Sequence, residues 1–307
     1  MKKISWIIFT IAVLLCLALV TIGCGGKASN SPASTQAAAS APDTSAGTSA
    51  PSTATSPDSA STTTTTATPA SATPASAASA FANSSALPTP PAGAKVFSQV
   101  EQMPGWASCG TASCAGGSGK STFWMAQNQT TPSLSGSSME VYNSGTNANA
   151  LWWMHLGADN SVSNFIWDFY VQLDSTSTSA AQALEFDAFQ FVGGYNYMIG
   201  SQCAYAAGVW DVWDELNNKW VPTTVPCKPL APNVWHHIQW YVQRVPNTHT
   251  YHYVTLVVDG TPYTVDQTYS AKNNGWADNL GVQYQLDVNG TGSGYHEWID
   301  QSTFTVW

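Results

Sequence analysis

Residues 251–265 read Tyr-His-Tyr-Val-Thr-Leu-Val-Val-Asp-Gly-Thr-Pro-Tyr-Thr-Val, and this stretch decides the fold. Two runs rich in β-branched and aromatic residues, Tyr251 to Val258 and Thr261 to Val265, flank the pair Asp259-Gly260. Such residues favour strands, and Asp-Gly tolerates the positive φ angles that a two-residue hairpin turn requires. The stretch therefore predicts a β-hairpin.

The same kind of pattern recurs through residues 138–306. A second hairpin is predicted where Ala207 to Glu215 and Lys219 to Val225 flank Asn217-Asn218. The other predicted strands are Ser138–Tyr142, Leu151–Leu156, Phe165–Asp174, Ala183–Phe191, Tyr195–Gln202, Trp235–Arg244, Gly281–Asp287 and His296–Val306. The one short helix expected lies near Ser177 to Gln182. About ten strands joined by loops of Gly, Asn, Ser and Pro predict an all-β, two-sheet antiparallel sandwich.

The N-terminus has the layout of an export signal. Lys2 and Lys3 precede an apolar run from Ile4 to Val20, and Gly23 stands directly before Cys24. A charged start, an apolar centre and a small residue before the cleavage point are typical of secretory signals. The segment resembles the lipobox of bacterial lipoproteins, whose Cys becomes the first mature residue and carries lipid. We expect residues 1–23 to be a signal peptide and Cys24 to be lipidated; a plain signal peptide with an incidental Cys is the alternative.

Residues 24–93 form a polar segment of Ala, Ser, Thr and Pro. Asp43 and Asp58 are its only acidic residues, and it lacks the large apolar side chains that offset chain entropy. We predict a disordered tether that separates the folded domain, residues 94–307, from a lipid anchor. Gly25 and Gly26 follow Cys24 without an Asp, which in lipoproteins permits sorting to an outer membrane. We expect a chain held at the cell envelope or surface by its N-terminal lipid only.

The composition of residues 94–307 limits the partners of the domain. This part holds 13 of the 14 Trp residues and all six His residues. It carries 16 of the 18 Asp and Glu residues but six of the nine Lys and Arg residues, a net charge of about −10. An acidic domain with a single Arg does not suit nucleic acid or a polybasic membrane surface. We therefore expect no nucleic-acid partner.

Cysteine usage indicates an oxidising compartment. Of six cysteines, Cys16 falls in the signal and Cys24 is the lipidation site. The other four allow three pairings, among which we favour Cys109 with Cys114 and Cys203 with Cys227. A structural zinc site is the competing interpretation, but the spacing fits no common zinc pattern well.

Alternation within two strands predicts a polar, uncharged binding face. In Trp235–Arg244, an apolar face of Ile238, Trp240 and Val242 alternates with the face that presents His237, Gln239, Tyr241 and Gln243. In the strand around Tyr284, the polar positions are Gln283, Gln285 and Asp287. Amides hydrogen-bond to sugar hydroxyls, and aromatic rings stack on the apolar faces of pyranoses. The alternative is that these are ordinary polar positions of a protein with few charges.

A bent sandwich that ends in Glu297-Trp298-Ile299-Asp300-Gln301-Ser302-Thr303-Phe304 resembles the concanavalin A-like lectin and glucanase superfamily, with its jelly-roll fold. Within it, Glu185-Phe186-Asp187-Ala188-Phe189-Gln190 is similar to the Glu-x-Asp-x-x-Glu motif of family 16 glycoside hydrolases. The resemblance implies that Glu185 is the nucleophile, that Asp187 orients it and that Gln190 occupies the acid/base position. An amide cannot protonate a leaving group, so the mechanism lacks its acid unless Glu140 or Asp287 supplies one.

Three functions follow from these observations. We prefer a carbohydrate-binding, lectin-like module for neutral polysaccharide, with the binding face set around Glu185. The alternatives are a glycan-cleaving hydrolase or lyase that uses Glu185 and Asp187, and a structural adhesin without a small ligand. The same two carboxylates could bind a structural Ca²⁺ ion; no other cofactor is expected.

Overall fold

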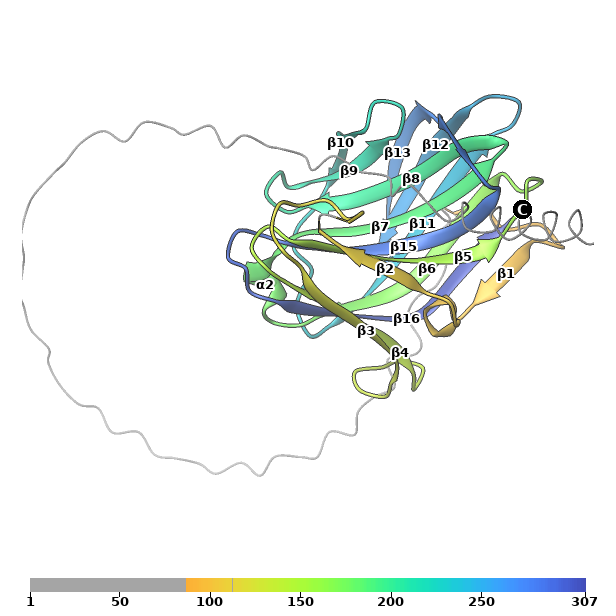
Figure 1. Cartoon of the computed structure of the whole chain (residues 1–307). Helices are drawn as coiled ribbons and strands as arrows, with labels where there is room; N and C mark the ends of the chain where they lie inside the picture. Colours follow the sequence, from red (N-terminus) through yellow and green to blue (C-terminus); the bar gives the residue numbers. More distant parts are fainter. Residues whose placement is uncertain (1–86, 112) are drawn as a thin grey trace, which may run out of the picture. The chain divides into compact units, whose positions relative to one another are not determined.

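The computed structural model describes residues 87–111 and 113–307, which form two eight-stranded antiparallel sheets (Figure 1). This confirms the predicted all-β jelly-roll sandwich. The described helices are a 3-10 turn, η1 (Val100–Gln102), and α2 (Ser177–Ala180), where a short helix was expected. Within the described residues, no helix is long and apolar enough to cross a membrane. The predicted signal, Cys24 and most of the tether lie outside the described residues.

Sheet A has the strand order β13-β12-β11-β6-β16-β4-β3, and β1 pairs with β16. The expected hairpin is β12 and β13, where Val258 pairs with Thr261. Its turn residues Asp259 and Gly260 have φ angles of 48° and 76°, as the sequence predicts. The strands of sheet A are β1 (Lys95–Ser98), β3 (Thr122–Gln129), β4 (Ser138–Ser144), β6 (Asn164–Leu173), β11 (Trp235–Val245), β12 (Thr250–Val258), β13 (Thr261–Ser270) and β16 (Tyr295–Val306).

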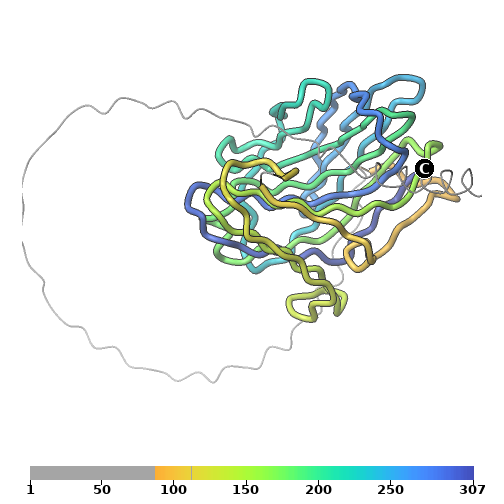
Figure 2. Tube along the Cα trace, viewed as in Figure 1, coloured from red at the N-terminus to blue at the C-terminus, as the bar shows by residue number. Residues whose placement is uncertain are grey.

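Sheet B has the order β10-β9-β8-β7-β15-β5-β2, and β14 pairs with β8. The second expected hairpin is β9 and β10, and Asn218 in its turn has a φ angle of 49°. The strands of sheet B are β2 (Ala107–Gly110), β5 (Asn149–Gly157), β7 (Ala181–Val192), β8 (Gly194–Ala204), β9 (Val209–Asp214), β10 (Lys219–Pro226), β14 (Lys272–Trp276) and β15 (Asn279–Val288). The trace shows that strands distant in sequence, such as β7 and β15, lie side by side (Figure 2).

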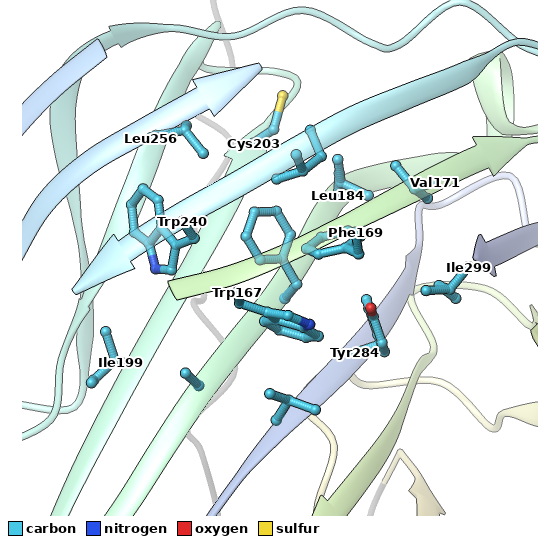
Figure 3. Packing of buried hydrophobic residues seen from close by; sticks show 14 of the residues in the cluster. Trp167, Phe169, Val171, Leu184, Ile199, Cys203, Trp240, Leu256, Tyr284 and Ile299 are labelled. Carbon is cyan, nitrogen blue, oxygen red and sulfur yellow. The ribbon is translucent and has the colours of Figure 1, made fainter. Parts of the chain in front are cut away.

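Aromatic side chains fill the space between the two sheets. Trp167 and Phe169 of β6 meet Tyr284 of β15 (Figure 3). Both also contact Phe186 of β7. The Trp167 and Tyr284 ring centroids are 4.8 Å apart, and those of Phe169 and Phe186 are 5.0 Å apart. Edge-to-face and tilted pairs of this kind add to the free energy that area burial already provides. This core fixes which face of each strand points outward.

Tyrosine hydroxyls tie the backbones of the two sheets together across this core. Tyr251 and Tyr253, from sheet A, both donate a hydrogen bond to the Trp213 carbonyl of sheet B, at 2.8 and 2.9 Å. At the other side of the sandwich, the Asp287 backbone N–H donates to the Tyr295 hydroxyl at 3.1 Å. These bonds fix two strands of sheet B, β9 and β15, relative to sheet A.

The structure contains both favoured disulfides, Cys109–Cys114 and Cys203–Cys227. The first joins Cys109 in β2 to Cys114 in the loop that follows, and the second joins Cys203 in β8 to Cys227, directly after β10. Both pairings favoured from sequence spacing are therefore confirmed, and they agree with a location outside the reducing cytoplasm.

We predict that the two disulfides differ in their contribution to stability. The Cys203–Cys227 bridge closes a sequence separation of 24 residues, and the Cys109–Cys114 bridge one of five. In the chain-entropy model, removing the bridge of the longer loop by C203A/C227A costs about 3.5 kcal/mol and removing that of the shorter loop by C109A/C114A about 2 kcal/mol. Denaturant unfolding measures both. Equal losses, or a larger loss for the short loop, would contradict this ranking.

Candidate functional site

Strand β7 carries the two carboxyls that the sequence singles out. Leu184 and Phe186 point into the core, and because side chains alternate along a strand, Glu185 and Asp187 point to the opposite, outer face of sheet B. Their residues are only 7% and 2% exposed. The two carboxyls are therefore outward-facing but poorly solvated.

The neighbouring strand β15 adds a third carboxyl and two amides to this face. Gln283 pairs with Asp187 and Gln285 pairs with Glu185, while Asp287, 2% exposed, follows on the same side. We call Glu185, Asp187 and Asp287 the carboxyl cluster. Asp287, which the sequence offered as one of two substitute acids, thus joins the predicted pair. The other, Glu140, lies on sheet A and bonds to His296.

Hydrogen bonds hold the carboxyl cluster in place. The Gln285 amide donates to Glu185 Oε2 at 2.8 Å and to Asp287 Oδ1 at 3.0 Å. The Gln283 amide donates to Asp187 Oδ2, and the Ser201 backbone N–H donates to Asp187 Oδ1 at 3.0 Å. The Gln285 amide therefore links the carboxyl of Glu185 to that of Asp287.

Burial shifts the ionisation of all three groups in one direction. It raises the pKa of Asp187 to about 7 and that of Asp287 to about 6. Burial, followed by the charges of Asp287 and Asp187, raises the pKa of Glu185 well above its usual value. Desolvation disfavours the charged form, and like charges nearby add to that effect. Asp187 and Asp287 therefore exchange protons near neutral pH.

Tryptophans flank the cluster on both sides. Cross-strand pairing places Trp220 and Trp213 beyond one side of Asp187, and Trp153 beyond Gln283 on the other. The first two rings pack edge to face, with centroids 5.2 Å apart. Gly200 lies between Asp187 and Trp213, where an added Cβ would come within 2.9 Å of the Trp213 Cβ. The outer face of sheet B thus has a polar centre between indole rings.

A second amide and carboxyl pair continues the polar centre. Gln202 on β8 pairs with Glu185 on one side and with Asp211 on the other. The Gln202 amide donates to Asp211 Oδ2 at 3.2 Å, whereas the buried Asp211 Oδ1 has no hydrogen-bond partner. Burial raises the pKa of Asp211 above its usual value. Sequence reasoning missed Gln202, Asp211 and the three tryptophans, although the alternation in Trp210-Asp211-Val212-Trp213 is a usable signal.

Gln190 does not belong to this face, and its implied place beside Glu185 is wrong. The pairing of β7 with β15 and β8 runs without a bulge from Ala183 to Phe191, and Gln190 stands five positions after Glu185. An odd number of steps along a regular strand reverses the face. Gln190 is fully buried, and its amide oxygen accepts a 2.7 Å hydrogen bond from Arg244 Nε.

The predicted binding face is also divided between two sheets. Gln283 and Gln285 lie with the carboxyl cluster on sheet B, whereas β11 belongs to sheet A. The expectation that both groups surround Glu185 is wrong, because alternation fixes the face of a strand but not the sheet that it joins. The residues thereby placed on the opposite side of the sandwich are His237, Gln239, Tyr241 and Gln243.

His237 and Gln239 line a cavity of about 600 Å³ on the outer face of sheet A. His237 Nε2 lies 2.7 Å from Asp168 Oδ1, and the Gln239 amide donates to Asp168 Oδ2 at 2.7 Å. The His237 ring stacks on Tyr170, with centroids 4.3 Å apart. Residues 87–99 close one side of the cavity through Leu87 and other side chains. Tyr241 and Gln243 bond to each other and to Asn164 instead.

Residues 87–111 and 113–307 contain no group of three or more His, Cys, Asp or Glu side chains arranged to hold a metal ion. The Ca²⁺ interpretation of Glu185 and Asp187 therefore gains no support from their geometry. Both carboxyls bond to amide groups instead.

Comparison with known proteins gives general likeness in fold. No family model and no curated protein matches the chain, so membership of the concanavalin A-like superfamily stays a prediction. Among solved structures, it is similar to one from a study of carbohydrate-binding modules of the β-sandwich superfamily (11% identity, 66% of this chain, 58% of that one, TM-score 0.35). It is also similar to the cellulose-induced protein Cip1, with 15% identity over 65% of this chain and 90% of that one and a TM-score of 0.39. For the alginate lyase Aly36B the identity is 9% over 56% of this chain and 81% of that one, and the TM-score is 0.40. These likenesses concern β-sandwich architecture only, and we draw no functional argument from them.

We predict that stability falls as pH rises through neutrality, and that the carboxyl cluster contributes to the fall. A carboxyl whose pKa is raised in the folded state stabilises the fold below its unfolded pKa near 4, and this contribution is lost as pH rises through about 7. A tenfold difference in proton affinity between the folded and unfolded states corresponds to about 1.4 kcal/mol. Asp187→Asn should therefore make the melting temperature depend less on pH between 4 and 8.

The control for this experiment is Asp278→Asn, which removes an exposed carboxyl. Glu101, whose pKa burial raises to about 7, adds to the wild-type slope from outside the cluster, so the comparison between variants is decisive. If melting temperature changes with pH to the same extent in wild type, Asp187→Asn and Asp278→Asn, Asp187 is ionised in the folded protein at acidic pH.

Proposed function

We propose that the outer face of sheet B binds a neutral polysaccharide. The observation that carries this is the carboxyl cluster itself, three outward-facing acids that are desolvated and linked through amides. None of the described Lys or Arg side chains forms an ion pair with them. Burying such groups lowers stability, and clusters with shifted pKa values are concentrated at functional sites.

The chemistry of this face suits hydroxyl groups. Protonated carboxyls and amides each donate and accept hydrogen bonds, as do the hydroxyls of a sugar. Trp153 on one side and Trp220 on the other offer flat rings for the apolar faces of pyranoses. A polyanionic glycan does not suit the same face, because its carboxylates would approach acids that ionise near neutral pH.

We predict that truncation of this face weakens binding in a residue-specific manner. Gln283→Ala and Trp153→Ala should each lower the association constant by roughly 3- to 10-fold, the effect of about 1 kcal/mol from one hydrogen bond or aromatic contact. Glu185→Gln retains the shape and should change affinity little. Titration calorimetry against soluble β-glucan, xylan and mannan measures the losses, with Gln239→Ala on sheet A as the matched control. Loss of binding in the control, with Gln283→Ala unaffected, would place the site elsewhere.

Glycan cleavage is a second candidate because the Gln285 amide links two carboxyls, those of Glu185 and Asp287. When one of them holds a proton and the other does not, they provide an acid beside a base, which are the two groups that glycosidic cleavage needs. Release of new reducing or unsaturated ends that disappears in Glu185→Gln would support cleavage. Binding without new ends supports the binding module, and the absence of both binding and new ends supports an adhesin.

The position of Gln190 changes which substitution tests the enzyme hypothesis. Restoring the family motif by Gln190→Glu would place a carboxyl in the core beside Arg244 and the Val162 carbonyl. It would not place an acid next to Glu185. Asp287→Asn is the informative variant, because it removes the carboxyl that shares the Gln285 amide with Glu185.

We also propose that Cys24 anchors the chain to the cell envelope through lipid. The sequence around Cys24 supports this, and the two disulfides agree with export. We predict that Cys24→Ala moves the protein from the detergent-rich phase to the aqueous phase, or leaves it unprocessed. Metabolic labelling with a fatty acid gives the direct readout. Unchanged phase partitioning of Cys24→Ala, together with an unlabelled wild type, would contradict the proposal.

A further inference from the structure

Four rings form a continuous patch on the outer face of sheet A. Trp124 on β3, Tyr142 on β4 and His296 on β16 pair with one another across three adjacent strands, and Trp298 lies two residues further along β16. We call these four residues the aromatic strip. It lies on the sheet opposite to the carboxyl cluster, and none of its rings belongs to the binding face predicted from the sequence.

The rings of the aromatic strip contact one another in sequence. Trp124 stacks on Tyr142 with centroids 5.6 Å apart and planes inclined by 22°. The Tyr142 and His296 centroids are 4.6 Å apart, and His296 stacks on Trp298 at 5.6 Å with an inclination of 12°. Two inter-strand spacings of about 4.8 Å separate β3 from β16, so the strip extends about 10 Å across the strands.

Neighbouring residues hold these rings in position. Glu140 Oε1 lies 2.8 Å from His296 Nδ1, which fixes the plane of the imidazole. Gly294 leaves the space that the Tyr142 ring fills, because a Cβ at Gly294 would overlap the Tyr142 hydroxyl oxygen. The strip is thus arranged before any ligand arrives, which lowers the entropic cost of binding.

The Trp124 side chain, at one end of the strip, is exposed. Trp124 is 40% exposed, on the strand at the edge of sheet A. Among residues 87–111 and 113–307, it is the only Phe, Tyr or Trp residue exposed to this degree. An aromatic edge strand invites aggregation, and proteins normally protect such edges with charge. Thr122 and Ser144 border the strip on one side and Gln172 on the other, and the carboxyl beside it, that of Glu140, bonds to His296.

We propose that the aromatic strip is a second polysaccharide-binding surface, which stacks on the flat faces of consecutive pyranose rings. Its length across the strands matches a pair of linked sugars, and the bordering hydroxyls and amide match their equatorial hydroxyl groups. A glycan whose substituents are all equatorial presents the flattest C–H faces, so the occupant is an unbranched β-1,4-linked glucan. The surface is distinct from the sheet B site and does not depend on it.

The test uses the full chain and two probes, insoluble cellulose and soluble cello-oligosaccharide. Trp124→Ala should lower the association constant for both by roughly 3- to 10-fold, the effect of one aromatic contact. Gly294→Ala, which displaces Tyr142 without removing a ring, should lower it as well. Leu216→Ala is the matched control, because it truncates an exposed apolar residue, 51% exposed, on the β9–β10 turn. Melting temperatures confirm that each variant is folded.

The outcomes separate this inference from the proposed function. Binding that falls in Trp124→Ala and survives in Gln283→Ala supports the strip even if sheet B binds nothing. Binding that falls in Gln283→Ala and is unchanged in Trp124→Ala overturns the strip and leaves the proposed function in place. A wild-type protein that binds neither cellulose nor cello-oligosaccharide also overturns the inference. If Trp124→Ala converts a dimer into a monomer without changing retention, the strip is a self-association surface and the inference fails.

Discussion

The sealed aromatic core between two sheets is the constraint on which the rest of the structure depends. Trp167, Phe169, Phe186 and Tyr284 can meet only if their strands present them inward, and alternation then fixes every neighbouring side chain. Phe186 inward places Glu185 and Asp187 outward on β7. The same rule turns Gln190 inward, five steps from Glu185. The carboxyl cluster is therefore a consequence of core packing, which also holds its strands in place.

Because the backbone holds the three carboxyls of sheet B close together, ionising them would destabilise the fold. Tyr295 in the core bonds to the Asp287 backbone, and the Ser201 backbone bonds to the Asp187 carboxylate, so these acids cannot move apart to relieve repulsion. The system lowers its free energy by taking up protons instead, which is what raised pKa values describe. The result is a set of donors and acceptors that needs little rearrangement to meet hydroxyl groups.

Local pattern was sufficient to predict much of the fold. Asp259-Gly260 determined the β12–β13 hairpin, cysteine spacing indicated both disulfides, and alternation showed which side of β11 and β15 is polar. What local pattern cannot specify is which strands become neighbours, since pairing joins segments far apart in sequence. For that reason Gln239 and Gln283, similar in sequence context, were assigned to one face although they lie on opposite sides of the sandwich. The aromatic strip was missed for a related reason: strand β3 was not predicted, so Trp124 had no expected neighbours.

The placement of Arg244, Lys95 and Lys272 supports the proposal of a neutral ligand. Arg244, the single Arg in the chain, donates to Gln190 and to the Asn160 and Val162 carbonyls, so its guanidinium holds a loop against the core. Lys95 lies over the Phe97 ring, and Lys272 donates to Asn218. An anionic polysaccharide needs cations presented together on one face, whereas these three side chains make separate structural contacts. Amides, hydroxyls, acids that hold protons and indole rings remain on the two outer faces, and together they match sugars without charge.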